Sequence, residues 1–448
     1  MWQLSLKNCW DGGKSKSRTR PYQTSVGSLI VNDSLSPRVR YRPRPGMIPR
    51  ALHRYAVLVA LATLILLIAG GLVTSYGVGM AVPDWPNSYG YNMFLFPFSN
   101  WVGGIFYEHS HRLIASAAGL ATAILTLWLY GWKSRPASRW TGACLLAGGF
   151  LIPAASAAHK EDAIVMAVLG LALLLTSFGW PRSEPAPRWL RRLGLIAFVA
   201  IVMQGVLGGL RVVLFKDELG IFHAALAQLF FVLICLLALF TSPWWWKMRR
   251  RGDGRATLKI DRRVRFWFLA GTSLIFLQLI LGATMRHQHA GLAIPDFPLA
   301  YGRVWPAMDP ESVTSYNRQR IEVTAPNPIT PFQIGLHMAH RLLGFATLAC
   351  VSAVAVVVRR RLGSQHELSR LALLWNGLLA LQVGLGAATI WSNKAADIAT
   401  AHMLVGAVAL SLGASACVIS ARNSLFARSR TGSADSAACK SLALRWNL

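Results

Sequence analysis

The sequence has few charged residues, and acidic residues are especially scarce. Only 14% of the 448 residues are charged, with 18 Asp and Glu against 46 Lys and Arg, which gives a formal net charge of +28. Soluble domains carry about a quarter of their residues charged, so this composition argues against a soluble enzyme. Nucleic-acid binding is also excluded, because the basic residues fall between long apolar runs and not on folded soluble faces.

The six cysteines form no CxxC or CxxCH motif. They lie inside apolar runs or in the two tails, so no disulfide framework, zinc site or covalently attached haem is indicated. A secretory signal is also missing, because residues 1–50 are rich in Arg, Ser and Pro and contain no apolar core segment. We interpret residues 1–52 as a basic, disordered cytoplasmic tail near anionic lipid, with a mitochondrial transit peptide as the alternative.

Apolar residues are abundant and make up 54% of the chain. Ten segments approach the roughly 20 apolar residues that a helix needs to cross a bilayer. The predicted fold class is therefore an all-α polytopic membrane protein. The predicted spans cover residues 55–75, 106–129, 140–157, 163–178, 193–210, 221–240, 266–283, 334–358, 371–390 and 401–419.

Basic residues cluster in alternate connections between these segments. They lie at residues 1–54, 133–139, 188–192, 247–251, 359–361 and beyond 422. Because Lys and Arg accumulate on the cytoplasmic side of a membrane, both termini are predicted to be cytoplasmic. The two long connections, 76–105 and 286–331, then face outward. This alternation requires that the third and fourth segments are either both spans or both absent.

An internal repeat relates the two halves of the chain. GVGMAVPDWPNSYG after the first segment corresponds to HAGLAIPDFPLAYG after the seventh, and EHSHRLIASAAGL corresponds to HMAHRLLGFATL. We therefore predict two duplicated four-helix bundles arranged as parallel repeats, with a helix pair inserted at about 140–180 in the first half only. The predicted domains after the N-terminal tail are a bundle at 53–245, a basic cytoplasmic linker at 246–265, a bundle at 266–420 and a cytoplasmic tail at 421–448.

Four of the eleven histidines recur at matching positions, His111 with His340 and His223 with His402. An ionisable residue inside a membrane helix indicates a functional site. Two imidazoles at the same depth on facing helices are what six-coordinate haem requires, and nearby glycines would admit a flat ring. A non-haem metal is the rival ligand, but its sites usually add carboxylates or thiolates, which are few near these histidines.

Five other histidines fall at helix ends or in loops. We predict that they are ordinary solvated residues, although two of them could shape the outer mouth of the site. The five are His109, His159, His287, His289 and His366, and the two are His287 and His289.

Glu108 lies three residues before His111, on the same helix face, where the second half has His337. It either forms a structural ion pair with Arg112 or faces the haem edge as a base or charge stabiliser. In the second case one half performs chemistry and the other holds a permanent electron-transfer haem. Arg112 and Arg341 are candidates for contacts with haem propionates, with interfacial anchoring as the alternative.

These residues resemble the haem A synthase family, membrane proteins of eight helices in two four-helix halves. The resemblance covers residues 52–420 apart from the inserted pair. Its motifs are E-x-x-H-R at 108–112, the PDWP and PDFP loops, the QG-x-LGG helix and the spaced His223, His340 and His402. It implies an oxidoreductase that converts the C8 methyl group of haem O into the formyl group of haem A for terminal oxidases.

The resemblance also implies the roles of the site residues. The N-terminal half would bind substrate haem O through His111 and His223, with Glu108 catalytic, and the C-terminal half would bind a haem b cofactor through His340 and His402. A second haem is a reasonable outlet for the electrons removed from the substrate. Many members have cysteines in the outer loops, but neither long loop here contains Cys, so a loop disulfide is not carried over.

The same resemblance implies a location and partners. The expected location is the bacterial cytoplasmic membrane, with the mitochondrial inner membrane as the alternative. The expected partners are haem O synthase and the assembly of terminal oxidases, and the protein could form a homo-oligomer. Two other functions stay open, a di-haem electron carrier without haem-modifying chemistry and a transporter, which the repeat suggests and which predicts no haem absorbance.

Overall fold

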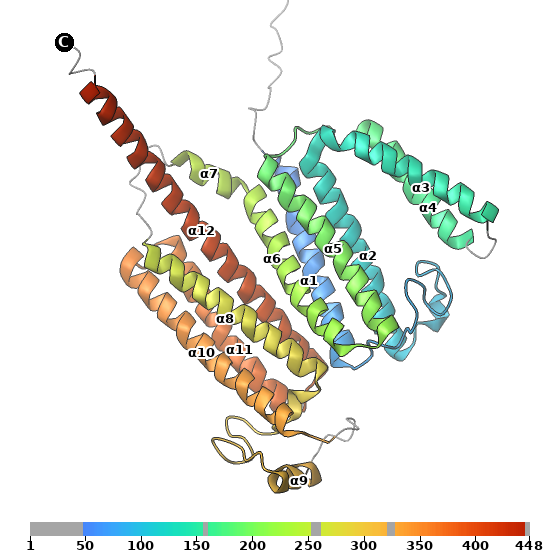
Figure 1. Cartoon of the computed structure of the whole chain (residues 1–448), viewed down its shortest axis with the longest axis vertical. Helices are drawn as coiled ribbons and strands as arrows, with labels where there is room; N and C mark the ends of the chain where they lie inside the picture. Colours follow the sequence, from blue (N-terminus) through green and yellow to red (C-terminus); the bar gives the residue numbers. More distant parts are fainter. Residues whose placement is uncertain (1–47, 156–159, 252–260, 320–327, 444–448) are drawn as a thin grey trace, which may run out of the picture. The chain divides into compact units, whose positions relative to one another are not determined.

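The computed structural model describes residues 48–155, 160–251, 261–319 and 328–443. The predicted N-terminal tail up to residue 47, residues 252–260 of the predicted linker, His159 and residues 444–448 lie outside this part of the chain. Within it the fold is α-helical without β-strands, which confirms the predicted fold class (Figure 1). The long helices are α1 (Arg50–Ser75), α2 (Gly103–Tyr130), α3 (Arg135–Ala155), α4 (Lys160–Gly179), α5 (Arg188–Leu214), α6 (Asp217–Thr241), α8 (Arg262–His287), α10 (Pro331–Leu362), α11 (Glu367–Trp391) and α12 (Ala396–Ala443).

Nine helical stretches in the described residues are long and apolar enough to cross a membrane, where the sequence predicted ten. The difference arises because α2, a 3-10 turn at Gly131–Ser134 and α3 form one stretch, Gly103–Leu151. Its 49 residues would extend about 74 Å as a single helix, more than twice the thickness of a hydrocarbon core. The chain turns between α2 and α3, and α3 packs against α4 as a helical hairpin (Figure 1).

Eight of the long helices form two groups of four, and in each group every helix contacts two neighbours, so that the four close a ring. In the first, α1 contacts α2 and α6, and α5 contacts α2 and α6. In the second, α10 contacts α8 and α11, and α12 contacts α8 and α11. We call these groups the first and second bundles; α1 and α6 contact α12, and α6 contacts α8, where the bundles meet. The origin of the bundles by duplication stays a prediction.

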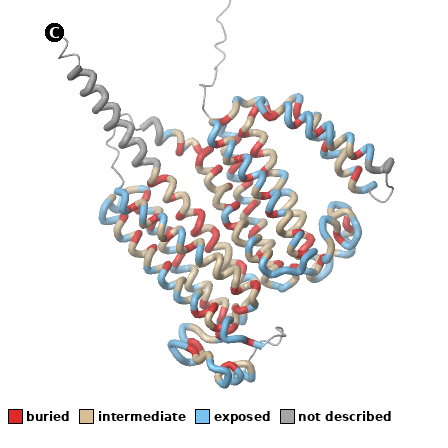
Figure 2. Tube along the Cα trace, viewed as in Figure 1, coloured by how far each residue is buried: buried red, intermediate tan, exposed pale blue. Residues whose placement is uncertain are grey.

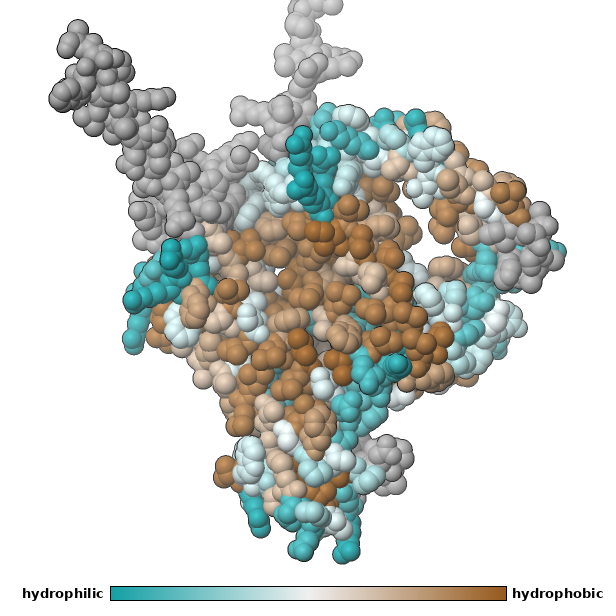
Figure 3. All heavy atoms as spheres, in the orientation of Figure 1, coloured by the Kyte–Doolittle hydropathy of each residue, from teal (hydrophilic) through white to brown (hydrophobic). Residues whose placement is uncertain are grey.

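The helix surfaces carry large apolar side chains. Figure 2 shows buried residues where helices face one another and exposed residues along their outer sides. On α1, for example, Leu58, Leu61 and Ile65 are 57%, 53% and 54% exposed. On the face drawn in Figure 3, apolar residues cover most of the middle and hydrophilic residues gather toward the ends. Such a surface is suited to lipid, because exposing these apolar side chains to water costs free energy.

Polar caps determine where several helices begin. Helix α10 starts at a capping box in which the Thr330 hydroxyl accepts from the Gln333 backbone N–H and the Gln333 side chain accepts from the Thr330 backbone N–H, with proline at the first helical position. The Asp309 carboxylate caps the short helix α9 (Pro310–Arg318) by accepting from the backbone N–H of Ser312. This hydrogen bond lowers the pKa of Asp309 below its ordinary value.

Three boundaries differ from the sequence predictions. Helix α9 lies in a long connection where no helix was predicted, and α7 (Pro243–Arg251) occupies the start of the predicted linker. Helix α12 continues to Ala443, past the predicted helix end at residue 419. Helices α7 and α9 and the continuation of α12 contain no long apolar run, so a search for apolar runs does not detect them.

Candidate functional site

A cavity of about 680 Å³ lies inside the molecule and is lined by residues of both bundles. The four repeated histidines, each on a different helix, all line it: His111 on α2, His223 on α6, His340 on α10 and His402 on α12. Each lies six to nine residues after the start of its helix, so the four share a similar depth. The structure therefore brings together the four residues that the sequence paired.

The geometry of the second pair suits a bis-imidazole haem. The ring centroids of His340 and His402 are 6.4 Å apart, and the ring planes are inclined by 70°. A metal–nitrogen bond to histidine is about 2 Å, so two such bonds in line, plus the distance from each nitrogen to its ring centre, span about 6 Å. The Nδ1 atom of His402 is buried without a hydrogen-bond partner. The two rings are thus spaced for one iron atom between them.

A glycine on a neighbouring helix supports each of the four rings. A Cβ atom added at Gly70 would stand 2.9 Å from Cε1 of His111, and one at Gly208 would stand 3.2 Å from Cε1 of His223. In the second bundle the corresponding distances are 3.2 Å from Gly282 to His340 and 3.3 Å from Gly386 to His402. These separations are closer than ordinary carbon–carbon contact, so a larger residue would push the imidazole from its position.

Three glutamines, which the sequence reasoning missed, bind the histidine helices from the same neighbouring helices. Each lies four residues before the supporting glycine and donates from its Nε2 to a histidine carbonyl oxygen. The pairs are Gln204 with His223 at 3.0 Å, Gln278 with His340 at 2.9 Å, and Gln382 with His402 at 2.8 Å. The fourth neighbour, α1, has Leu66 at this position. A Q-x-x-x-G spacing was the signal that could have revealed them.

Glu108 is buried, with 3% of its surface exposed, and it lines the cavity. Its Oε1 accepts a hydrogen bond from Arg112 at 2.9 Å, and the two side chains form an ion pair one helical turn apart. Its Oε2 accepts from the backbone N–H of Val82 in the first long loop at 2.8 Å. The ion pair considered from the sequence is therefore present, and the same carboxylate also faces the space beside His111.

Arg112 and Arg341 line the cavity and anchor the two long loops. Arg112 Nη1 donates to the carbonyls of Asp84 and Asn87 at 2.8 and 3.0 Å. Arg341 Nη2 donates to the carbonyl of Asp296 at 2.7 Å, while its guanidinium lies over the Phe297 ring. The terminal nitrogens of both arginines are thus engaged by loop backbone.

The two loops share a local geometry around their Pro-Asp motifs. Asp84 accepts from the backbone N–H of Tyr89 and of Gly90, both at 2.8 Å. Asp296 accepts in the same way from the two residues at equal spacing, Tyr301 and Gly302, at 2.7 and 2.8 Å. Each of these tyrosines and glycines has a positive φ. A charged acceptor therefore holds a left-handed turn in each loop.

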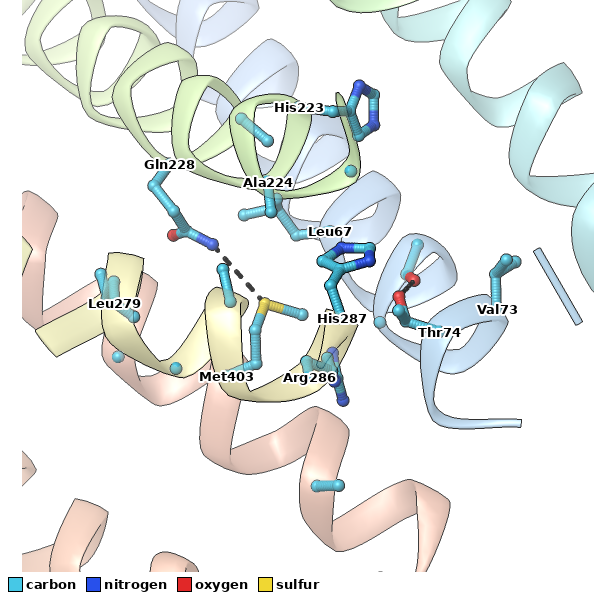
Figure 4. Close-up of a pocket in the computed structure, with 18 of the residues that line it drawn as sticks. Leu67, Val73, Thr74, His223, Ala224, Gln228, Leu279, Arg286, His287 and Met403 are labelled. Atoms are coloured by element: carbon cyan, nitrogen blue, oxygen red, sulfur yellow. Dashed lines mark hydrogen bonds between the residues drawn. The ribbon is translucent and has the colours of Figure 1, made fainter. Parts of the chain in front are cut away.

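Two further arginines line the cavity, and neither was predicted from the sequence. Arg211 lies in the last turn of α5. Arg286, near the end of α8, donates from Nη2 to the Ser75 hydroxyl at 2.5 Å, and Ser75 is 3.1 Å from the Thr400 hydroxyl. Figure 4 shows Arg286 near the Gln228–Met403 contact, which joins α6 to α12 over 3.7 Å. The contacts of Arg286 with Ser75, of Ser75 with Thr400 and of Gln228 with Met403 thus link the two bundles at the cavity wall.

The prediction that the remaining histidines are solvated was wrong for two of them. His109 has no exposed surface: Ser88 lies within hydrogen-bond distance of its Nδ1, at 3.1 Å, and its ring packs against Phe96 and Trp101. His287 is 7% exposed and lines the cavity (Figure 4). Both lie near helix ends. The first long loop covers His109 and the other bundle covers His287, and because these parts are distant in the sequence, the local sequence does not indicate the burial.

Two of the remaining histidines keep contact with solvent. His289 is exposed and also lines the cavity, whereas His366 is half-buried and caps α11 by accepting from the Leu368 backbone N–H. His337 occupies the position that corresponds to Glu108, and it is buried at the cavity with its Nδ1 unpartnered. Among the described residues no three His, Cys, Asp or Glu side chains are grouped as ligands for a bare metal ion.

The fold and the site define a polytopic membrane protein whose internal cavity offers two pairs of imidazoles to haem-sized groups. The sequence model of the cytochrome oxidase assembly protein family matches residues 161–413, more than half of the chain. The chain therefore belongs to this family, as the resemblance predicted. The matched residues include His223, His340 and His402.

Curated relatives match a larger part of the chain. A protein of Geobacillus kaustophilus named Heme A synthase is 24% identical over 361 residues, which cover 79% of this chain and 86% of the relative. Proteins of the same name from Alkalihalophilus pseudofirmus and Bacillus cereus are 20% and 23% identical, over 80% and 79% of this chain and 93% and 88% of the relatives.

Proposed function

We propose that this protein is a haem A synthase, an oxidoreductase that converts the C8 methyl group of haem O into the formyl group of haem A. The observation that carries the proposal is the pair of histidines in each bundle, with each ring set against a glycine at one shared cavity. Similarity to bacterial proteins named Heme A synthase over 79–80% of the chain supports it.

The first bundle is proposed to hold the substrate, haem O, between His111 and His223. Glu108 lies one turn before His111 and lines the cavity. A carboxylate at the substrate edge can accept a proton or stabilise developing positive charge. Converting the methyl group into a formyl group takes up one oxygen atom, which water can supply, and releases protons and electrons in steps. Because the second bundle has His337 at this position, the chemistry is assigned to the first bundle.

The second bundle is proposed to hold haem b as a resident cofactor between His340 and His402. When bound there, its contribution is one-electron transfer, which gives the electrons leaving the substrate an outlet. Gln278 supports this site because its Nε2 donates to the His340 carbonyl at 2.9 Å and so fixes the position of the histidine on its helix. The glycine behind each ring keeps the imidazoles facing the cavity.

Propionate groups of both haems carry negative charge and need cationic partners. Arg112 and Arg341 are proposed for this role from the sequence, but their terminal nitrogens already bond to loop carbonyls. Arg211 and Arg286 also line the cavity. We therefore propose that these two arginines share the binding of propionates, with the first two holding the loops over the site.

One observation favours the second candidate function, a di-haem electron carrier. Both oxygens of Glu108 have protein partners, Arg112 and the Val82 backbone. If this carboxylate serves only to hold the first loop, the two histidine pairs suffice for electron transfer without haem modification. The two functions make different products, so they are separable by chemistry.

Pigment extraction from membranes tests the proposed function. The chain is expressed in cells that make haem O and lack another haem A synthase, and the haems are extracted and separated by chromatography. We expect haem A to accumulate at the expense of haem O. Haem O without any haem A, in membranes whose purified protein shows haem absorbance, would support the carrier. A purified protein without absorbance in the Soret region would contradict both functions and support a transporter.

The protein is also proposed to have a defined location and partners. The nine apolar helical stretches and the bacterial relatives support a protein of the bacterial cell membrane. Both termini are proposed to be cytoplasmic. An enzyme that makes haem O must supply the substrate, and the assembly of a terminal oxidase would consume the product.

A further inference from the structure

In the first bundle the cavity reaches the lipid-facing surface between α2 and α5. Four residues line the cavity and are exposed on the outside of the bundle as well: Leu120 on α2, and Phe198, Val202 and Gly205 on α5. The three large side chains are 56%, 37% and 49% exposed, respectively. A Cβ atom added at Gly205 would meet nothing within 4 Å. The site of His111 and His223 is thus continuous with an apolar groove open to the bilayer.

Side chains and helix packing limit the groove on its inner side and at one end. Ile201 closes it from the inside, with its side chain 4.0 Å from the position of a Cβ at Gly119. Further along, the Thr126 hydroxyl donates to the carbonyl of Gly194 at 2.9 Å, so α2 and α5 pack directly against each other. Between Gly208, behind the His223 ring, and Phe198 the helix rises about 15 Å. The groove therefore runs along the two helices away from the long loops.

The second bundle differs at the same register. Five residues after the first histidine of each pair stand Ser116 and Phe345, and three residues before the second ring's glycine stand Gly205 and Val383. Ser116 has a small side chain that bonds to its own helix at Arg112 O. In the second bundle the positions matching Leu120, Phe198 and Val202 are Ala349, Asn376 and Ala380, and none of these described residues lines the cavity.

We propose that the groove lined by Ser116, Leu120, Phe198, Val202 and Gly205 holds the isoprenoid chain of the substrate haem. This inference rests on the proposed function and names the feature by which the two bundles select different haems. Haem O carries a farnesyl chain where haem b has a vinyl group. An apolar chain of this kind is stabilised by contact with apolar side chains and lipid, and it needs an exit that a vinyl group does not.

The two bundles differ in the space beside their histidines. In the second bundle the larger Phe345 and Val383 stand where the first bundle has Ser116 and Gly205, and both line the cavity. Phe345 is 48% exposed, so its ring lies at the point where a chain leaving the porphyrin toward the bilayer would pass, and the two side chains narrow that exit. The second bundle therefore accepts the unprenylated haem. The groove also provides a lateral route by which a prenylated haem enters from the membrane with its chain already in lipid.

The test transplants the residues of the second bundle into the first. The Ser116→Phe/Gly205→Val variant is expressed with a haem O source and purified, and its extracted haems are counted per polypeptide. We expect the content of haem O plus haem A to fall at least tenfold, while the haem b content equals that of wild type. The matched control is Gly377→Val on α11, an exposed helical glycine with nothing within 4 Å of an added Cβ, which should leave all haems unchanged.

The amount of each haem bound per polypeptide, and not the rate of haem A formation, tests whether the groove holds the isoprenoid chain. A double variant that retains haem O plus haem A at the wild-type level overturns the groove. If the double variant loses haem b as well, the single Gly205→Val variant is judged by the same ratio of prenylated haem to haem b, and an unchanged ratio overturns the groove. A wild-type protein that binds haem O but never makes haem A contradicts the proposed enzyme and leaves the groove supported.

Discussion

Glu108 is the residue on which the proposed chemistry depends most. It is buried between Arg112 and the backbone of Val82 and still lines the cavity beside His111. A buried ion pair is weak evidence for stability, since its desolvation offsets much of the attraction between the charges. The pair can instead hold the carboxylate oriented toward the cavity, which a loop anchor alone would not require.

Replacing Glu108 separates catalysis from loop anchoring. We expect Glu108→Ala to lower the rate of haem A formation at least about a hundredfold, because a positioned acid or base contributes roughly that much or more. The haem b content should stay at the wild-type level, since His340 and His402 lie in the other bundle. Haem A formation is followed by pigment chromatography, and haem b by the reduced visible spectrum.

The conservative variant provides the control. Glu108→Gln keeps an oxygen that can accept from the Val82 N–H, but it removes the charge and the ability to take up a proton. Activity as low as that of Glu108→Ala would support the chemical role. Wild-type activity in Glu108→Gln would show that the residue serves only to hold the loop.

At the scale of residues, the sequence predicted the site residues that are repeated in both halves of the chain. It did not predict those whose role depends on contacts between distant residues. The four histidines were predictable because imidazoles inside apolar helices are rare and matched between the halves. The roles of Gln204, Gln278 and Gln382 were missed because their Q-x-x-x-G spacing does not by itself indicate a partner, and only the fold shows that each bonds a histidine carbonyl. The burial of His109 likewise depends on the first long loop folding over it.

The helices act in pairs, with one presenting a histidine and its neighbour presenting a glycine. This pairing predicts that a large residue at the glycine removes the haem of that bundle only. Gly70→Leu should lower the content of haem O plus haem A at least tenfold and spare haem b, whereas Gly282→Leu should remove haem b, because the new side chain would displace His111 or His340. Haems extracted from each purified variant are counted, with Gly377→Leu as the control. Equal haem contents in all three variants would contradict the supporting role of the glycines.

At the scale of elements the apolar runs predicted every helix that is long and apolar, since lipid selects for such segments. They could not show that α2 and α3 are joined by a short 3-10 turn, or that α12 continues through a polar segment. The role of α3 and α4 was also beyond the sequence, which indicated an inserted pair and nothing about where it packs. In the structure the two helices pack mainly on each other.

On the scale of the whole molecule, the net charge is proposed to be mainly a signal of orientation. The prediction is tested with single cysteines in a background where the native cysteines are replaced. Ser99→Cys lies in the first long loop and Ser364→Cys between α10 and α11, and both serines are exposed. We expect a membrane-impermeant maleimide to label Ser99→Cys in intact cells and Ser364→Cys only after permeabilisation. Labelling of Ser364→Cys in intact cells, with Ser99→Cys labelled only after permeabilisation, would show that the chain has the opposite orientation.

The central claim for the whole molecule is that the two bundles hold different haems, one as substrate and one as cofactor. The most direct measurement compares two double variants, His111→Ala/His223→Ala and His340→Ala/His402→Ala, each purified from cells that make both haem O and haem b. The haems of each are extracted and identified. The first variant is predicted to retain haem b and lose haem O and haem A, and the second to lose haem b. Retention of haem O or haem A by the first variant, with loss of its haem b, would contradict the claim.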